Sequence, residues 1–137
     1  MQGSLGIGAN LNTWGEAEFA GATKMVAAYK RIRQTVQQGE LYRLVRPDAA
    51  SGRAATFYVS QDKRQAVLFA FLHSSTKLDR QPLIQVMGLD PQKQYRVKSV
   101  EGDAAGETQS GAYWMGHGVD VSMTGDFQAK GLIFEAQ

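Results

Sequence analysis

The segment QAVLFAFLHS, residues 65–74, is apolar over almost its whole length. A continuous apolar run of this length between polar flanks is typical of a strand that is buried on both faces. We therefore predict a central β-strand here, and a mainly β chain around it.

Shorter segments of similar character surround this strand, and turn residues separate them at intervals close to those of β-sandwiches. In two of them, 94–100 and 119–123, apolar and polar residues alternate, which indicates one buried and one solvated face. The complete set of predicted strands is 41–45, 55–60, 65–74, 82–89, 94–100, 119–123 and 131–136. We expect residues 40–137 to form an antiparallel β-sandwich of two sheets. A flexible loop at 101–111 and one helical turn capped by Ser110 complete this prediction.

One long helix is predicted ahead of the strands, over residues 16–38. Its apolar side chains recur at steps of three and four and so form one stripe: Phe19, Ala22, Val26, Tyr29, Ile32 and Val36. Gly15 is acceptable as the N-cap, and Glu18 lies in the first turn, where the helix dipole favours a carboxylate. Gly39 is placed for a left-handed C-terminal stop.

Length and composition exclude several classes of protein. A chain of 137 residues is long enough for one domain core, and 15 basic against 13 acidic residues leave a formal charge of only +2. We therefore expect no nucleic-acid partner. Without cysteine there is no disulfide or thiolate chemistry, and no apolar run reaches the length of a membrane span. We expect a soluble, unprocessed, cytoplasmic chain with no membrane partner and no cofactor.

Motifs for phosphate binding and metal binding are incomplete. Gly6 and Gly8 fit the first two positions of a dinucleotide-binding G-x-G-x-x-G, but Leu11 occupies the third. His73 and His117 lie far apart in the sequence, with no ligand spacing typical of zinc. We therefore predict neither a phosphate loop nor a metal site.

A catalytic pair of carboxylates is not visible either. Glycosidases need two carboxyl groups that face each other across a sugar. Most acidic residues here fall in turns, where they bond local backbone, and only Asp120 and Asp126 lie near aromatic residues and a histidine in the sequence. Exposed aromatic rings could still stack on a sugar, and the neighbours Tyr113 and Trp114 are the best candidates, with core packing as the alternative.

Several motifs together resemble the C-terminal end of the bacterial α-galactosidases of glycoside hydrolase family 36. The most specific are LGIGANL in residues 5–11, GELYRL in 39–44 and SGAYWMGHG in 110–118, and the resemblance covers residues 3–137. Such enzymes combine an N-terminal β-supersandwich, a catalytic (β/α)₈ barrel and a C-terminal antiparallel β-sandwich. The resemblance implies that residues 1–39 are the last strand and helix of the barrel and that residues 40–137 are the C-terminal β-sandwich.

The same resemblance assigns a place to the N-terminal residues. Barrel enzymes carry their sites at the C-terminal ends of the strands, so Asn10, Asn12 and Trp14 would lie near the mouth of the pocket for an α-galactoside. The nucleophile and acid/base aspartates of the family lie on earlier strands in motifs absent from this sequence, and we assign no catalytic residue. Homo-oligomers are expected from the family.

Two hypotheses remain open from the sequence. In the first, the chain is a C-terminal, accessory fragment of an α-galactosidase that acts on melibiose and raffinose with retention by double displacement. In the second, it is a free-standing carbohydrate-binding or protein-interaction module with Tyr113 and Trp114 as its contact surface. The apparent barrel element in residues 1–39 favours the first.

Overall fold

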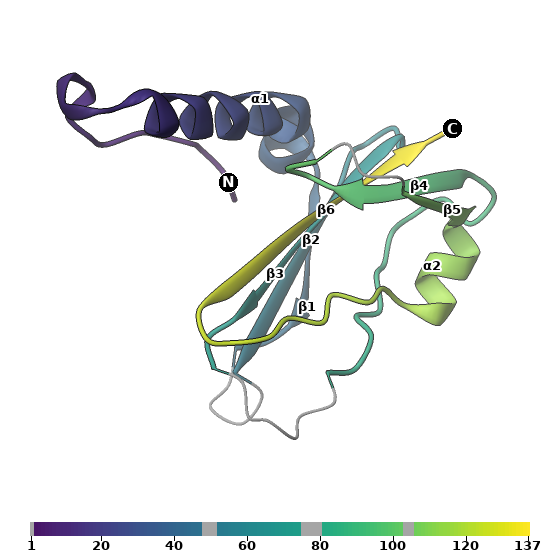
Figure 1. The fold of residues 1–137 in the computed structure, drawn as a ribbon. Coiled ribbons are helices and arrows are strands. Elements are labelled where there is room, and N and C mark those ends of the chain that lie inside the picture. Colours follow the sequence, from purple (N-terminus) through teal and green to yellow (C-terminus); the bar gives the residue numbers. More distant parts are fainter. Residues whose placement is uncertain (1, 48–51, 75–80, 103–105) are drawn as a thin grey trace.

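We analysed a computed structural model of the chain, which describes residues 2–47, 52–74, 81–102 and 106–137. The chain forms one antiparallel sheet of six strands with a long helix against one face (Figure 1). The strand order is β1-β2-β3-β6-β4-β5. The strands are β1 (Glu40–Val45), β2 (Arg53–Val59), β3 (Gln65–Leu72), β4 (Gln94–Ser99), β5 (Glu107–Ser110) and β6 (Gln128–Ala136).

The prediction of a central strand at 65–74 is confirmed, because β3 lies between β2 and β6. Leu68 is paired with Phe57 on one side and with Leu132 on the other. Ala66, Val67 and Leu68 are fully buried. Successive side chains of a strand point to opposite faces, so this burial requires cover on both faces of the sheet.

The helix α1 (Glu16–Gln38) has the predicted bounds. The Glu18 carboxylate accepts a hydrogen bond from the backbone N–H of Gly15 at 3.0 Å and so satisfies one donor at the helix start. The predicted left-handed stop at Gly39 is wrong, since its φ of −78° and ψ of 168° are extended. Glycine is needed there for space: a Cβ would lie 2.3 Å from the Thr35 carbonyl oxygen and 2.6 Å from that of Val59.

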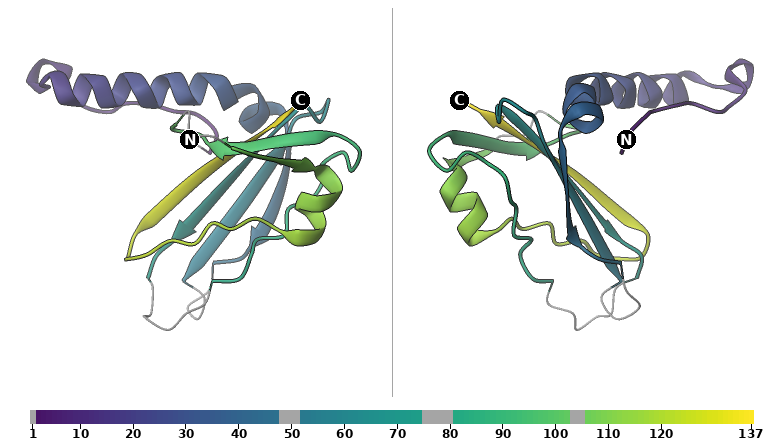
Figure 2. Two further views of the ribbon diagram at one scale, coloured as in Figure 1. Left: turned by 45° about the vertical axis from the view of Figure 1, so that its right-hand side comes forward. Right: turned by 180° about the vertical axis from the view of Figure 1, so that it is seen from behind.

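Only the C-terminal half of α1 packs on the sheet. Ile32 and Val36 are buried against a cluster that includes Val67 and Ile133. Full burial of a side chain such as Ile32 contributes roughly 1.5–3 kcal/mol. The N-terminal half projects past the sheet (Figure 2), and Phe19 there is 46% exposed.

The opposite face carries the larger core, and its cover is irregular. The short helix α2 (Gly111–His117) and the segments 82–89 and 119–123 cross this face (Figures 1 and 2). Ser110 caps α2 as predicted, because its hydroxyl oxygen accepts a hydrogen bond from the backbone N–H of Tyr113.

The predicted two-sheet sandwich is wrong. Segments 82–89 and 119–123 form one bridge, Ile84 with Val119, in place of the two expected strands. The Gln81 side chain bonds the backbone N–H and carbonyl of Met123 in place of a ladder. Alternating burial therefore reflects an extended backbone with one inward face, which does not require a second sheet.

The predicted loop at 101–111 contains β5, which pairs with β4 at the edge of the sheet. Its residues, ETQS, have no apolar side chain, so no alternation signalled the strand. Of the loop, residues 103–105 lie outside the described residues. Within the described part of the chain, no helix is both long and apolar enough to cross a membrane.

Candidate functional site

The predicted N-terminal site residues lie together at the start of α1. Asn10 caps a short 3-10 helix, Leu11–Thr13, and its side-chain oxygen accepts a hydrogen bond from the Asn12 backbone N–H at 3.2 Å. The Trp14 ring contacts the Phe19 ring edge to face at a centroid distance of 5.3 Å. The Asn10 side chain thus stabilises the local turn, and both asparagines remain exposed.

A shallow groove of about 350 Å³ adjoins these residues. Its lining is mostly apolar and comes from the N-terminal segment and the first half of α1: Ile7, Leu11, Trp14, Phe19, Ala22, Thr23, Val26, Ala27 and Lys30. Ile7 and Leu11 are 47% and 49% exposed. Large apolar side chains gathered at this exposure are typical of a contact surface. Residues 2–10 form no helix or strand, so the N-terminal strand that the resemblance implied is not formed in the described part of this structure.

The other predicted pair, Tyr113 and Trp114, does not form a shared platform. Trp114 is 5% exposed, packs against Phe134 in the core and donates a hydrogen bond from its indole nitrogen to the Tyr95 carbonyl oxygen at 3.2 Å. Tyr113 is 36% exposed and stacks on the His117 ring with an interplanar angle of 9°. Core packing therefore accounts for the tryptophan and leaves one exposed ring.

The two groups of predicted site residues are far apart. The start of α1 lies at one end of the molecule, and α2 lies on the other side of it in both views of Figure 2. One ligand the size of a sugar cannot contact both groups.

Asp120 accepts hydrogen bonds from the Ser122 hydroxyl at 2.6 Å and from the Ser122 backbone N–H at 2.8 Å. These bonds, the hydroxyl first, lower the pKa of Asp120 below its usual value of 3.8. A carboxylate held this way stabilises a turn and resists protonation. A general acid must carry the proton that it donates, so Asp120 does not suit that role. Among the residues that the structure describes, no three His, Cys, Asp or Glu side chains gather closely enough to hold a metal ion.

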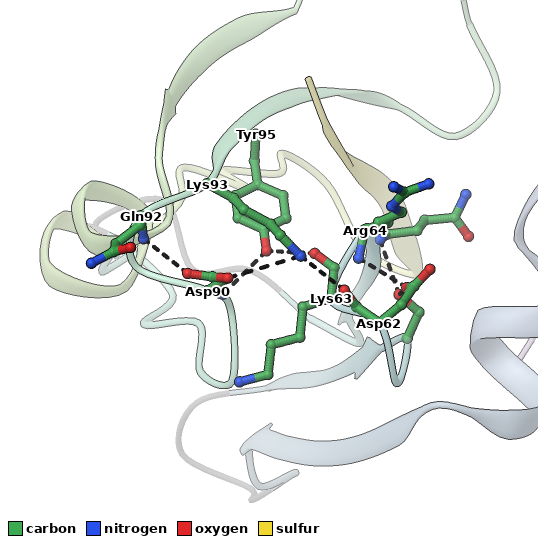
Figure 3. Close-up of polar contacts among 9 residues, drawn as sticks. Asp62, Lys63, Arg64, Asp90, Gln92, Lys93 and Tyr95 are labelled. Atoms are coloured by element: carbon green, nitrogen blue, oxygen red, sulfur yellow. Dashed lines mark hydrogen bonds and ion pairs between the residues drawn. The ribbon is translucent and has the colours of Figure 1, made fainter.

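A polar cluster, which we call the hairpin clasp, ties the β2–β3 turn to the turn before β4 (Figure 3). It consists of Asp62, Lys63, Asp90, Lys93 and Tyr95. The Tyr95 hydroxyl donates to the Lys63 carbonyl at 2.7 Å and accepts from the Asp90 backbone N–H at 3.1 Å. The Lys93 ammonium group donates to the Asp62 carbonyl at 2.9 Å and lies 3.8 Å from the Asp90 carboxylate. The bonds from Tyr95 to Lys63 and from Lys93 to Asp62 join the two turns, so the cluster stabilises the fold.

A third cluster of aromatic side chains was not predicted from the sequence. Phe71 is 39% exposed at the end of β3, and Phe127, just before β6, is 78% exposed. The Phe127 ring contacts that of His73 at a centroid distance of 4.9 Å. The available signal was the bulky apolar residue in the polar turn GDFQ (125–128), but only the strand register brings it beside His73.

Comparison with known proteins shows which family this chain resembles. The model of the glycosyl hydrolase family 36 C-terminal domain matches residues 53–134. Alpha-galactosidase 2 of Hypocrea jecorina is 29% identical over 137 residues, and alpha-galactosidase Mel36A of Lactobacillus acidophilus is 34% identical over 140. These alignments include all and 99% of this chain but only 17% and 18% of the two relatives.

Solved structures of family 36 α-galactosidases contain the same fold. The family 36 α-galactosidase AgaB of Geobacillus stearothermophilus superposes with a TM-score of 0.79 at 26% identity, over 93% of this chain and 17% of that one. An AgaA variant from the same species, solved in complex with raffinose, gives the same TM-score at 25% identity, again over 93% and 17%. Because the family model covers more than half of the chain and the solved structures share its fold, the chain belongs to the C-terminal domain of glycoside hydrolase family 36.

Proposed function

We propose that this chain is the C-terminal part of an α-galactosidase, and that the whole enzyme removes terminal α-galactosyl residues from sugars such as melibiose and raffinose. The observation that carries the proposal is that all or nearly all of this chain aligns with about one sixth of the length of each α-galactosidase. The reaction would proceed with retention by double displacement, on aspartates that precede this segment.

The chain's own role in this proposal is structural. Two carboxyl groups must flank one glycosidic bond, and Asp120, held in its own turn, does not meet that need. Residues 1–39 would be the last strand and helix of the catalytic barrel, followed by the C-terminal domain from residue 40. The exposed apolar groove along the first half of α1 supports this division, because a barrel would cover it.

The remaining parts of the proposal follow from that division. Asn10, Asn12 and Trp14 would lie at the rim of the galactoside pocket, at the C-terminal end of the last barrel strand. A cytoplasmic, bacterial, homo-oligomeric enzyme is the form that we propose.

Two measurements test the proposal. The reading frame upstream of Met1 should continue into a barrel that carries paired aspartates. The purified 137-residue chain should not hydrolyse p-nitrophenyl α-galactoside, whereas the complete protein should. Cleavage by the chain alone that Asp120→Asn abolishes would refute an accessory role. A frame with no barrel would favour a free-standing module.

A further inference from the structure

The sheet face that carries α1 loses its cover along β3. Val67, Phe69 and Phe71 point to this face, and their exposed fractions rise from 0% to 7% and 39% as the strand leaves the helix. His73, two residues further, is exposed. The end of this face is therefore an open surface on a rigid central strand.

Phe127 stands beside this open surface in a fixed and unfavourable conformation. Its φ of 54° lies in the left-handed region, which bulky residues rarely adopt. Its backbone N–H donates to the His73 carbonyl at 3.1 Å, and its ring meets the His73 ring at an angle of 77°. The ring is thus held in place while 78% of the residue remains in solvent.

A cavity of about 360 Å³ lies against Phe71 and His73. Gly52, with φ of 56°, closes one side: its carbonyl accepts the His73 backbone N–H at 2.7 Å. Ser74 completes the polar part of the lining, and Ala54 and Pro47 add apolar surface. Ligand pockets of this volume combine apolar walls with a few polar groups.

We propose that this cavity binds a neutral hexopyranoside. A pyranose ring offers one apolar C–H face and a rim of hydroxyl groups. The half-exposed Phe71 ring suits the first, and the His73 imidazole and the Ser74 hydroxyl suit the second.

Among the lining residues that the structure describes, the one charged group favours a neutral ligand over an anion. Arg53 also contributes to the lining, but it pairs with Leu72 in the strand register and so points to the opposite face. Its guanidinium donates to the Pro82 carbonyl at 3.2 Å on that side. The site goes beyond the proposed function, which places sugar contact at the start of α1.

Titration of the ¹⁵N-labelled chain with methyl α-galactoside, followed by NMR, tests the site. We expect saturable shifts at the amides of His73, Ser74 and Phe127, and none with glycerol at equal concentration. Phe71→Ala should weaken binding by about fivefold or more, the contribution of one aromatic contact. Met87→Ala is the control, because Met87 is an exposed apolar side chain (53%) on segment 82–89, which covers the opposite face of the sheet, and its loss should leave binding unchanged.

The proposal would be overturned if the amides showed no chemical-shift changes up to roughly 50 mM sugar, a concentration at which even weak sites respond. Equal shifts with glycerol would overturn it as well, and so would an equal loss of affinity in both variants. Circular dichroism of each variant excludes loss of fold as the cause. The readout does not depend on the proposed enzyme, whose test is hydrolysis by the complete protein.

Discussion

Replacing Tyr95 by phenylalanine removes one oxygen atom from the hairpin clasp and leaves the ring in place. Tyr95 is fully buried, and its hydroxyl joins the Lys63 carbonyl to the Asp90 backbone N–H. Both hydrogen bonds disappear in Tyr95→Phe, and no cavity larger than the lost oxygen forms. The change therefore isolates the contribution of the two bonds.

The expected cost follows from the number of bonds. One intramolecular hydrogen bond contributes about 1 kcal/mol net, so the loss of two should lower the free energy of unfolding by about 2 kcal/mol. Lys63 is exposed and Asp90 is half-buried, so water can reach part of the site and the larger penalty of a fully buried, unpaired group is not expected.

Urea unfolding followed by circular dichroism measures this cost. With a slope of about 2 kcal/mol per molar urea, the midpoint should fall by about 1 M while the slope stays unchanged. Tyr113→Phe is the matched control, since Tyr113 is 36% exposed and the described part of the chain offers its hydroxyl no hydrogen bond. A Tyr95→Phe midpoint equal to that of Tyr113→Phe would refute the role of the clasp.

Burial first, and nearby carboxylates second, raise the pKa of Tyr95 above 10.0, so its contribution to stability is present below pH 10 and is lost as the pH rises through the raised value. Above pH 10, thermal unfolding should show a smaller loss of stability in Tyr95→Phe than in the wild type. The pKa of Asp120 is lowered, so its contribution is present above pH 3.8 and is lost as the pH falls through the lowered value. Asp120→Asn should flatten the acid limb of the same unfolding profile. Phe69→Ala should cost about 3 kcal/mol in urea unfolding, and the more exposed Phe71→Ala about 1 kcal/mol or less. Light scattering should show self-association of the isolated chain, and Phe19→Ala should weaken it, because the apolar groove beside α1 is open; a strict monomer at high concentration would contradict this.

Local signals predicted the helix and the central strand. The period of α1 and the glycines at both of its ends lie within its own sequence, so its bounds were readable without tertiary information. The same holds for β3, whose apolar run is continuous. In contrast, the number of sheets depends on which backbone groups pair across the core. Residues 119–123 alternate in burial as a strand would, yet the side chain of Gln81 takes the place of a partner strand.

The site residues show the same difference between local features and tertiary contacts. Asn10 was predicted to lie near the mouth of a galactoside pocket, which stays a prediction; its bond to the Asn12 backbone N–H, a local feature, was not predicted. Trp114 was a candidate for sugar stacking, but adjacency to Tyr113 in the sequence does not tell which ring faces the core. The aromatic group of His73 and Phe127 joins residues 54 positions apart, and only the pairing of β3 with β6 could reveal it.

In the described part of the chain, the groove beside α1 and the cavity at the end of β3 are both open, and they differ in the chemistry of the partner that each can contact. The groove beside α1 is lined by aliphatic and aromatic side chains over several helical turns, with Lys30 as its one charged residue among those described, which suits a protein surface. The cavity at the end of β3 has a similar volume, but His73 and Ser74 give it hydrogen-bonding groups that a packed domain interface would leave unpaired. A catalytic domain that covered the first surface would leave the second free only if it stopped short of Phe127. Hydrogen exchange can decide this if the complete protein is compared with the isolated chain, because both proposals require protection to increase beside Phe19 and to stay unchanged at His73, whose backbone N–H already donates to the Gly52 carbonyl.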